Sequence, residues 1–287
     1  MAEDGPAPDT STWKKTPDGI AIPPPSPRDV LYDVRDAVAW ITLNRPLVLN
    51  AMNKNVQRLL LAAVERAEAD EDVKVVVLTG AGRAFSAGGD MWASLYPDDD
   101  PAPSGTEVQT RIWGLAKPVI AAVRGHAVGQ GCELAGACDL TIASETARFG
   151  EIQIRQGFAP PFLITPYLVN LKKAKELMLL GEVLDARQAE QAGLVNRVVP
   201  DSELEAAAEA MAKKLAALPQ STVRLDKALT NRVYELAGFR AGIGWNGDEA
   251  MRGLAEERDA VAEERHRIRQ ERGWSDFKQT RDRGYEG

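Results

Sequence analysis

Glu133 is the residue whose type and position are best suited to chemistry. It lies two residues after the end of a glycine-rich turn, in the run GQGCEL (129–134). The turn predicts a helix start, which places the carboxyl group of Glu133 on the first helical turn. Backbone N–H groups at a helix start have no partner inside the helix, so they face any oxygen that gathers negative charge. A carboxyl group beside such donors is suited to moving protons next to an activated carbonyl.

Two glycine-containing loops follow two strands that the sequence predicts to be buried, at 73–78 and 118–123. The first loop covers residues 85–90 and the second covers 125–131. Ligands of open parallel sheets bind at the carboxyl ends of the strands, and glycine lets a ligand atom approach the backbone closely. Two N–H groups that share one oxygen form an oxyanion hole. Such a site suits a thioester carbonyl that becomes an enolate.

The elements around these loops alternate between strands and helices. Residues 30–34 and 38–43 predict a hairpin, and an apolar stripe from Val56 to Val64 predicts a helix that Asn53 caps. Further helices are expected at 106–115, after the 125–131 turn, and at 172–180, 186–192 and 202–217, with strands at 140–143 and 195–199. The alternation indicates an α/β fold with a largely parallel sheet and right-handed crossovers.

The ends of the chain differ from its centre. Residues 1–28 are rich in proline and predict a tail that is ordered only if it packs on another part of the molecule. Residues 29–218 form the predicted core, and 219–287 a helical region. There Leu254, Val261 and Ile268 recur every seven residues, and Met251 extends the stripe. This narrow apolar face favours a helix that contacts another subunit, with a charged helix on its own core as the alternative.

Composition narrows the classes of partner. The chain has 287 residues, is 44% hydrophobic and carries a net charge of −7, which argues against nucleic acid or an anionic membrane as the main partner. Two histidines and the two cysteines Cys132 and Cys138 offer no multi-histidine or CxxC metal site, so no metal is expected. The first residues lack the apolar stretch of a secretory leader, and no segment has the ~20 apolar residues of a membrane span. We expect a soluble, cytoplasmic protein.

Five segments resemble, in this order, the crotonase (enoyl-CoA hydratase/isomerase) family. They are ITLNRP with NAM (41–46 and 50–52), AFSAGGD (84–90), KPVIAAVRG (117–125), GQGCEL with CDL (129–134 and 138–140), and QAGLVNRVV (191–199). The likeness extends from about residue 29 to the end of the chain, where GWSDFKQTR (273–281) is similar to the closing segment of the family. The resemblance implies a crotonase-like ββα-spiral core with a C-terminal helical trimerisation region.

By this resemblance the two oxyanion-hole donors are the backbone N–H groups of Gly89 and Gln130. The family usually has a small residue at the second position. The side chain of Gln130 is therefore expected to reshape the acyl pocket, to supply a polar contact, or simply to face solvent. The resemblance also implies that residues of the matching segments bind the acyl-CoA substrate, and these are Asn50, Ala51, Ala87, Gly88, Asp90, Phe277 and Lys278. Coenzyme A enters as part of the substrate, and no other cofactor is expected.

Three of these residues have more specific expectations. Asp90 is expected to fix its loop through backbone hydrogen bonds. Phe277 matches an aromatic residue that the family brings to the CoA site, often across a subunit boundary, and Lys278 is a candidate for reaching the CoA phosphates or an ordinary surface lysine. His126, which lies in the second loop before Gln130, is expected to have a structural role, with direct catalysis as the alternative.

Glu133 matches the first of the two catalytic glutamates of family hydratases. The second lies in a segment that reads FGEIQI (149–154) here, so that Gln153 occupies the catalytic place. A glutamine side chain can hold a water molecule but cannot exchange a proton at neutral pH. Glu151 precedes Gln153 by two residues, so on a strand both would share one face. A surface or structural carboxylate is the favoured interpretation of Glu151.

These observations favour a lyase of the hydratase/isomerase type that acts on an enoyl-CoA thioester through an enolate, with Glu133 as acid and base. The loss of the second glutamate leaves other crotonase-type reactions open, namely hydrolysis, decarboxylation or retro-aldol cleavage. A weakly catalytic acyl-CoA-binding protein is a further alternative. The expected assembly is a homotrimer or a dimer of trimers, without nucleic acid or membrane as partner.

Overall fold

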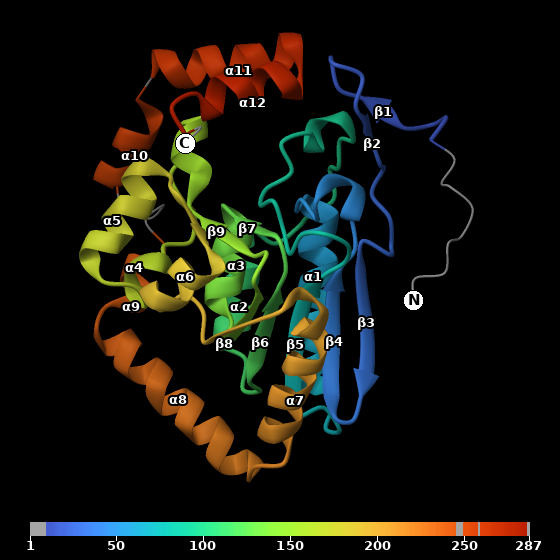
Figure 1. Ribbon diagram of the computed structural model, residues 1–287, viewed down its shortest axis with the longest axis vertical. Helices are drawn as coiled ribbons and strands as arrows, with labels where there is room; N and C mark the ends of the chain where they lie inside the picture. The colour runs from blue at the N-terminus through green and yellow to red at the C-terminus, as the bar shows by residue number, and fades with distance from the viewer. Residues whose placement is uncertain (1–9, 245–248, 258, 286–287) are drawn as a thin grey trace.

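A six-stranded sheet forms the centre of the molecule (Figure 1). The computed structural model describes residues 10–244, 249–257 and 259–285. In the order β11-β8-β6-β5-β4-β3, all neighbouring strands are parallel except the hairpin of β3 and β4. The strands are β3 (Val30–Arg35), β4 (Val38–Leu43), β5 (Val75–Gly80), β6 (Val119–Val123), β8 (Leu140–Ser144) and β11 (Arg197–Val199). The predicted hairpin and parallel sheet are confirmed.

Helices cover both faces of this sheet. On β5, Val75 and Val77 pack in one hydrophobic cluster with residues of α7 (Leu204–Ala216), whereas Val76 and Leu78 pack in another with residues of α1 (Lys54–Ala69). Successive side chains of a strand point to opposite faces, so both faces of β5 are apolar because both are covered. Asn53 caps α1 as predicted, since its side chain accepts a hydrogen bond from the N–H of Val56.

A second, three-stranded sheet was not predicted. It consists of β7 (His126–Val128), β9 (Arg148–Gly150) and β10 (Val183–Asp185), with β9 in the middle. β7 lies inside the segment that the sequence predicts to be a turn, and it leads into α3 (Gln130–Ala137). α2 (Gly105–Trp113) packs on α3 and also on α1. Further helical elements are η1 (Pro46–Val48), η2 (Ala93–Leu95), η3 (Ile152–Gln156), α4 (Thr165–Leu168), α5 (Leu171–Leu180), α6 (Ala186–Ala192) and η4 (Asp201–Glu203).

The C-terminal region is helical as predicted. It contains α8 (Gln220–Leu236), α9 (Phe239–Gly242), α10 (Glu249–Glu256), α11 (Ala260–Arg272) and α12 (Trp274–Asp282). Residues 245–248, 258, 286 and 287 of this region lie outside the described residues. The predicted seven-residue stripe is wrong as a single helix, because α10 ends between Leu254 and Val261. Both of these side chains are exposed, whereas Ile268 is buried in the molecule.

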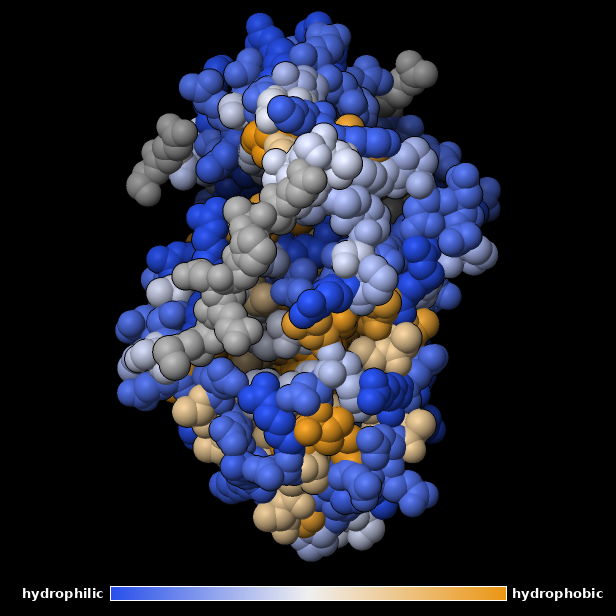
Figure 2. Space-filling model, turned by 90° about the vertical axis from the view of Figure 1, so that its right-hand side faces the viewer, coloured by the Kyte–Doolittle hydropathy of each residue, from blue (hydrophilic) through white to orange (hydrophobic). Residues whose placement is uncertain are grey.

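Residues 14–22 of the N-terminal segment pack on the rest of the chain, and residues 1–9 of the predicted tail lie outside the described residues. Strands β1 (Lys14–Lys15) and β2 (Ala21–Ile22) form a small hairpin beside η2. The hydroxyl of Tyr96 accepts a hydrogen bond from Lys14 N at 2.7 Å and donates one to Ile22 O at 2.9 Å. The side of the molecule that carries this segment is seen in Figure 2, where hydrophilic residues predominate at the upper end.

The structure adds three facts to the expectations from composition. Cys132 and Cys138 are both buried free thiols. Within residues 10–244, 249–257 and 259–285, no group of three or more His, Cys, Asp or Glu residues is arranged to hold a metal ion. In the same ranges no helix has both the length and the apolar character needed to cross a membrane.

Candidate active site

The two glycine-containing loops lie against each other at the carboxyl ends of β5 and β6. Ser86 N donates to His126 O at 2.8 Å, and this backbone pairing continues between the loops. At Gly88 the approach is so close that a β-carbon would lie 2.7 Å from the carbonyl oxygen of Val128 and 3.2 Å from Gln130 N. Gly88 also has a φ of +89°, which residues with a β-carbon rarely adopt. Glycine is therefore required here by both contact and conformation.

Gly89 and Gln130, the predicted oxyanion-hole donors, have N–H groups available for a ligand. In the part of the chain that the structure describes, neither N–H donates to a protein acceptor. Gly89 is exposed, and Gln130 is the first residue of α3, where the helix dipole adds partial positive charge. Since the loops approach each other next to both donors, one negatively charged oxygen can satisfy the two N–H groups together. Their function as an oxyanion hole remains a prediction.

Asn50 connects the first loop to the segment before α1. Its side chain is buried, and it accepts a hydrogen bond from Arg45 N at 2.8 Å and donates one to Ala84 O at 2.7 Å. Ala87 N donates to Leu49 O at 2.8 Å in the same region. The side chain of Asn50 is therefore used by the fold. The predicted contacts of Asn50, Ala51 and Ala87 with a substrate remain predictions.

Asp90 fixes its loop by a buried ion pair as well as by the expected backbone hydrogen bond. Its Oδ1 accepts from Trp92 N at 2.9 Å, and its Oδ2 lies 2.8 Å from Nη1 of Arg45. The Arg45 side chain is 2% exposed and that of Asp90 is 5% exposed. Arg45 also donates to the carbonyl oxygen of Ala51 at 2.6 Å, so one guanidinium group ties the loop to the segment that contains Asn50.

Glu133 lies at the base of this site, on the first turn of α3. Its side chain is fully buried and accepts hydrogen bonds from two glutamines, Gln153 at 2.8 Å and Gln109 of α2 at 3.2 Å. Burial raises the pKa of the Glu133 carboxyl group well above its ordinary value, and the nearby Glu151 carboxyl raises it further. A buried carboxyl group with a raised pKa beside free N–H donors is suited to acid–base chemistry on a bound carbonyl compound.

Gln153 and Glu151 do not lie on a strand. The strand β9 ends at Gly150, Glu151 precedes η3, and Gln153 belongs to η3. The side chains nevertheless meet, because Gln153 Nε2 donates to Glu151 Oε2 at 3.0 Å. Glu151 is only 2% exposed, so a surface carboxylate is wrong, whereas a structural carboxylate, the other half of the favoured interpretation, stays a prediction. Burial raises the pKa of its carboxyl group to about 7.

The side chain of Gln130 turns from α3 toward the start of α2. A β-carbon on Gly105 would lie 1.5 Å from Nε2 of Gln130, so the carboxamide occupies the space above the α-carbon of Gly105. Its Oε1 lies 3.9 Å from the position of a β-carbon on Gly89. Gln130 therefore places a polar group next to a predicted oxyanion donor, and it is only partly buried. This position favours a reshaped acyl pocket or a polar contact with the ligand over a side chain that simply faces solvent.

The C-terminal helices contact both sides of the site. Arg265 of α11 donates to Arg155 O of η3 at 2.6 Å, and Arg269 of α11 donates to Met91 O, just after Asp90, at 3.3 Å. α11 thus links the segment that carries Gln153 with the loop that carries Gly89.

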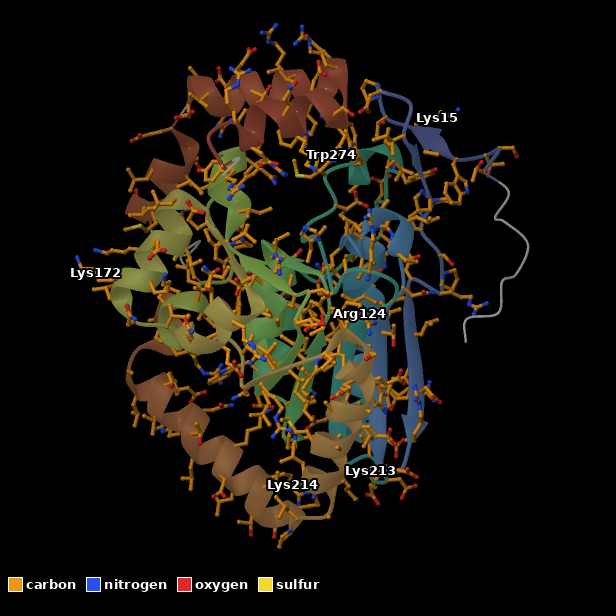
Figure 3. All side chains as sticks on the ribbon, viewed as in Figure 1. Lys15, Arg124, Lys172, Lys213, Lys214 and Trp274 are labelled. Carbon is orange, nitrogen blue, oxygen red and sulfur yellow. The ribbon has the colours of Figure 1, made fainter. Side chains whose placement is uncertain are left out.

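Phe277 and Lys278 lie on α12 in different environments. Phe277 is buried, with its ring centroid 5.5 Å from that of Trp274, which Figure 3 labels. Lys278 is exposed. In this structure Phe277 packs within its own chain, and contacts of either residue with CoA remain predictions.

His126 lies at the start of β7, next to positive charges. Desolvation lowers the pKa of its imidazole, and Arg83, Arg148 and Lys278 lower it further. Arg124, labelled in Figure 3 just after β6, forms an ion pair with Asp201 at 2.9 Å. Among the described residues no hydrogen bond joins the side chains of His126 and Glu133, and the structural role of His126 stays a prediction.

Comparison with known proteins agrees with this architecture. Residues 33–242 match the model of the enoyl-CoA hydratase/isomerase family. A short-chain-enoyl-CoA hydratase of Clostridium acetobutylicum is 37% identical over 212 residues, which cover 71% of this chain and 81% of that protein. The 2,3-dehydroadipyl-CoA hydratase of Escherichia coli (strain K12) is 34% identical over 272 residues, which cover 90% of this chain and 99% of that protein.

A solved structure supports the same assignment over most of the chain. The enoyl-CoA hydratase/isomerase from Xanthobacter autotrophicus Py2 superposes with a TM-score of 0.83 at 34% sequence identity, covering 90% of this chain and 99% of that one. The fold and the pair of facing loops therefore define an enzyme with a crotonase-type fold. The chain belongs to the enoyl-CoA hydratase/isomerase family.

Proposed function

We propose that this enzyme adds water to the double bond of an enoyl-CoA thioester, with Glu133 as the acid–base group. The observation that carries the proposal is the position of Glu133. Its buried carboxyl group lies on the first turn of α3, which starts with the free N–H of Gln130, and it is in hydrogen-bond contact with Gln153. The relatives named above are hydratases of enoyl-CoA substrates, which supports the same reaction here.

The reaction can be written with the groups of this site. The thioester oxygen accepts hydrogen bonds from the N–H groups of Gly89 and Gln130, which withdraws electrons from the conjugated double bond. A water molecule donates one hydrogen bond to Gln153 Oε1 and the other to the Glu133 carboxylate. Glu133 takes that proton as the water oxygen bonds to Cβ, and the double-bond electrons move to form the enolate. The Glu133 carboxylic acid then returns a proton to Cα, so that one water molecule has been added.

Gln153 motivates the second candidate function. It stands where family hydratases carry a second glutamate, so only one carboxyl group of the predicted catalytic pair can exchange protons. Other reactions that the same two N–H donors would stabilise are hydrolysis of a CoA thioester through a tetrahedral oxyanion, and decarboxylation or retro-aldol cleavage through an enolate, and none of them requires a second glutamate. Release of free CoA, CO₂ or an aldehyde from a panel of thioesters would favour this candidate over hydration.

The loss of the enoyl chromophore on hydration tests the leading proposal. Wild-type protein is expected to remove the absorbance of crotonyl-CoA or a longer enoyl-CoA, and Glu133→Gln to be slower by about 10²–10⁴-fold. Glu145→Gln is the matched control, because Glu145 is exposed and lies between β8 and β9. Equal rates for the wild type and Glu133→Gln would contradict the assignment.

We also propose that the chain forms a trimer or a dimer of trimers. In place of the stripe expected at 251–268, α8 exposes an apolar stripe in which each side chain is more than half exposed, formed by Leu225, Leu229, Val233 and Leu236. Burial of such a stripe against another copy would remove it from water. Light scattering on the wild type and on Leu229→Glu should give a multiple of three chains for the first and smaller species for the second.

A further inference from the structure

The amide of Gln153 lies between two buried carboxyl groups. Its Nε2 is 2.8 Å from Glu133 Oε1 and 3.0 Å from Glu151 Oε2. A primary amide nitrogen carries two hydrogens, and here each has its own acceptor. Both N–H donors of the Gln153 amide are therefore satisfied by acceptors within the protein.

The oxygen side of Gln153 remains available. Its Oε1 is buried and has no hydrogen-bond partner within the described part of the chain. It lies 3.8 Å from the position of a β-carbon on Gly129, the residue before the predicted donor Gln130. Because the nitrogen is held on the other side, the amide presents a hydrogen-bond acceptor, and not a donor, to a molecule bound beside α3. An acceptor is what a reacting water molecule needs.

Glu151 is itself held in place. Its Oε1 accepts a hydrogen bond from the hydroxyl of Thr165 on α4. The thiol of the buried Cys132 lies beside this carboxyl group and lowers its pKa. Glu151 thus has an anchor on its far side, and Gln153 is the only described residue that joins it to Glu133 by hydrogen bonds to both.

The groups around the carboxyls of Glu133 and Glu151 favour a single proton shared between these two residues. Apart from the two carboxyl groups themselves, the groups that act on the pKa values of Glu133 and Glu151 are Gln109, Gln153, Thr165 and the thiol of Cys132, all uncharged. In the described part of the chain no Lys, Arg or His forms a salt bridge with either glutamate. Two negative charges bridged by one amide in a buried site repel each other, and one group then keeps its proton. Loss of a proton from one carboxyl makes loss from the other harder.

We propose that Glu151 is a positioning residue of this active site, which holds the Gln153 amide by its nitrogen so that the carbonyl oxygen faces the substrate, and which shares a single proton with Glu133. The inference rests on the proposed function only for the identity of the molecule that Gln153 Oε1 accepts from. In the place of a second catalytic glutamate the enzyme has a glutamine whose orientation depends on a carboxyl group two residues earlier.

A titration without substrate tests the shared proton. In protein with ¹³C-labelled glutamate carboxyls, Glu133→Gln identifies the Glu133 signal, and its midpoint is compared between wild type and Glu151→Gln. The proposal predicts a lower Glu133 midpoint in Glu151→Gln, because the neighbouring negative charge is gone. Glu145→Gln, an exposed change of the same kind, should leave the midpoint in place. An unchanged midpoint in Glu151→Gln would overturn the shared proton.

Kinetics test the positioning role. Glu151→Ala removes the anchor of the amide and should lower kcat while KM changes little, whereas Glu151→Gln keeps an acceptor oxygen and should mainly move the pH profile. The exchange variant Glu151→Gln with Gln153→Glu should be more active than Gln153→Glu alone, in which three carboxyl groups are crowded together. Equal activity of Glu151→Ala and wild type would overturn the role. Absence of hydration by the wild type would instead contradict the proposed function, and the titration would still decide the shared proton.

Discussion

The carboxamide of Gln130 lies directly over the α-carbon of Gly105, so that the first residue of α2 has no room for a β-carbon while Gln130 keeps this position. The peptide N–H of the same glutamine is a predicted oxyanion donor. One residue therefore combines a predicted oxyanion donor with a polar side chain that lies beside Gly89, the other predicted donor.

Gln130→Ala should change the choice of acyl group. Removal of the side chain opens space next to Gly89, so kcat/KM for a branched enoyl-CoA should rise relative to crotonyl-CoA. The expected rise is roughly 10-fold or more for each additional methylene group that the enlarged pocket accommodates. Competition between the two substrates measures the ratio directly. Gly105→Ala should shift the same ratio by pushing the carboxamide aside, because the contacting atom is the end of a flexible side chain. An unchanged ratio in both variants would show that Gln130 does not border the acyl group.

The pH dependence of hydration should reflect the raised pKa of Glu133. Hydration requires the carboxylate form as base, so kcat/KM should fall as the pH is lowered through this pKa. The midpoint should lie well above 4.5, the ordinary value for glutamate, because burial and Glu151 both raise it. A pH–rate profile of the wild type measures it. A kcat/KM that stays constant from pH 8 down to about 4 to 5, where an ordinary glutamate titrates, would contradict a raised pKa of Glu133.

The free energy of unfolding should depend on pH in the opposite direction to the activity, because the raised pKa of Glu151 makes the folded state less stable as the pH rises. Its pKa is raised from 4.5 to about 7 in the folded protein, so the folded state binds a proton more tightly than the unfolded state. This contribution to stability is fully present below pH 4.5 and is lost as the pH rises to about 7. Melting temperatures of the wild type and Glu151→Gln across this range should therefore diverge with pH, with the wild type losing more stability. Parallel curves would rule out the raised pKa.

Breaking the ion pair of Arg45 and Asp90 should destabilise the loop that carries Gly89. Asp90→Asn leaves a buried guanidinium group whose nearest remaining carboxylate is Asp29, at 3.6 Å, and we expect a loss of about 3 kcal/mol in the free energy of unfolding. The exposed pair of Arg35 and Asp33 is the control, since its removal by Arg35→Met should cost less than about 1 kcal/mol. Urea denaturation of both variants gives the comparison, and similar losses would contradict the importance of burial.

Gly88→Ala should cost more than conformational strain alone. Its added β-carbon meets the Val128 carbonyl oxygen at 2.7 Å, whereas Gly19, with a similar φ of +83°, has nothing within 4 Å of that position. Gly19→Ala therefore measures the strain of a positive φ, about 1–2 kcal/mol. The excess in Gly88→Ala measures the contact between the loops. Equal losses of unfolding free energy would show that the loops separate easily.

Short stretches of sequence were sufficient to predict many of the helices and strands of the core. The side chain of Asn53 at the start of α1 and the apolar run of β5 depend on neighbouring residues, so the sequence predicted both. The strands β7 and β9 have three residues each, too few for a periodic pattern, and were missed. Ile152 and Ile154 alternate as in a strand, but these residues form η3, which ends at Gln156 with Gly157 as its C-cap at a φ of +81°.

The candidate site residues that the sequence could indicate are those that lie in short, recognisable segments. Gly89, Gln130 and Glu133 belong to loops and a helix start that short segments define. The role of Glu151 depends on Thr165, fourteen residues later, and on the way η3 turns its side chain inward. No pattern near Glu151 reports these contacts.

Proton NMR of crotonyl-CoA with the protein in D₂O tests the proposed hydration by Glu133 most directly. Hydration with Glu133 as the acid–base group should give 3-hydroxybutyryl-CoA with deuterium at the α-carbon from the wild type, and Glu133→Gln should not form this product. An unchanged spectrum with the wild type, repeated for longer, branched and aromatic enoyl-CoA thioesters, would contradict it. So would formation of the deuterated product by Glu133→Gln at the wild-type rate.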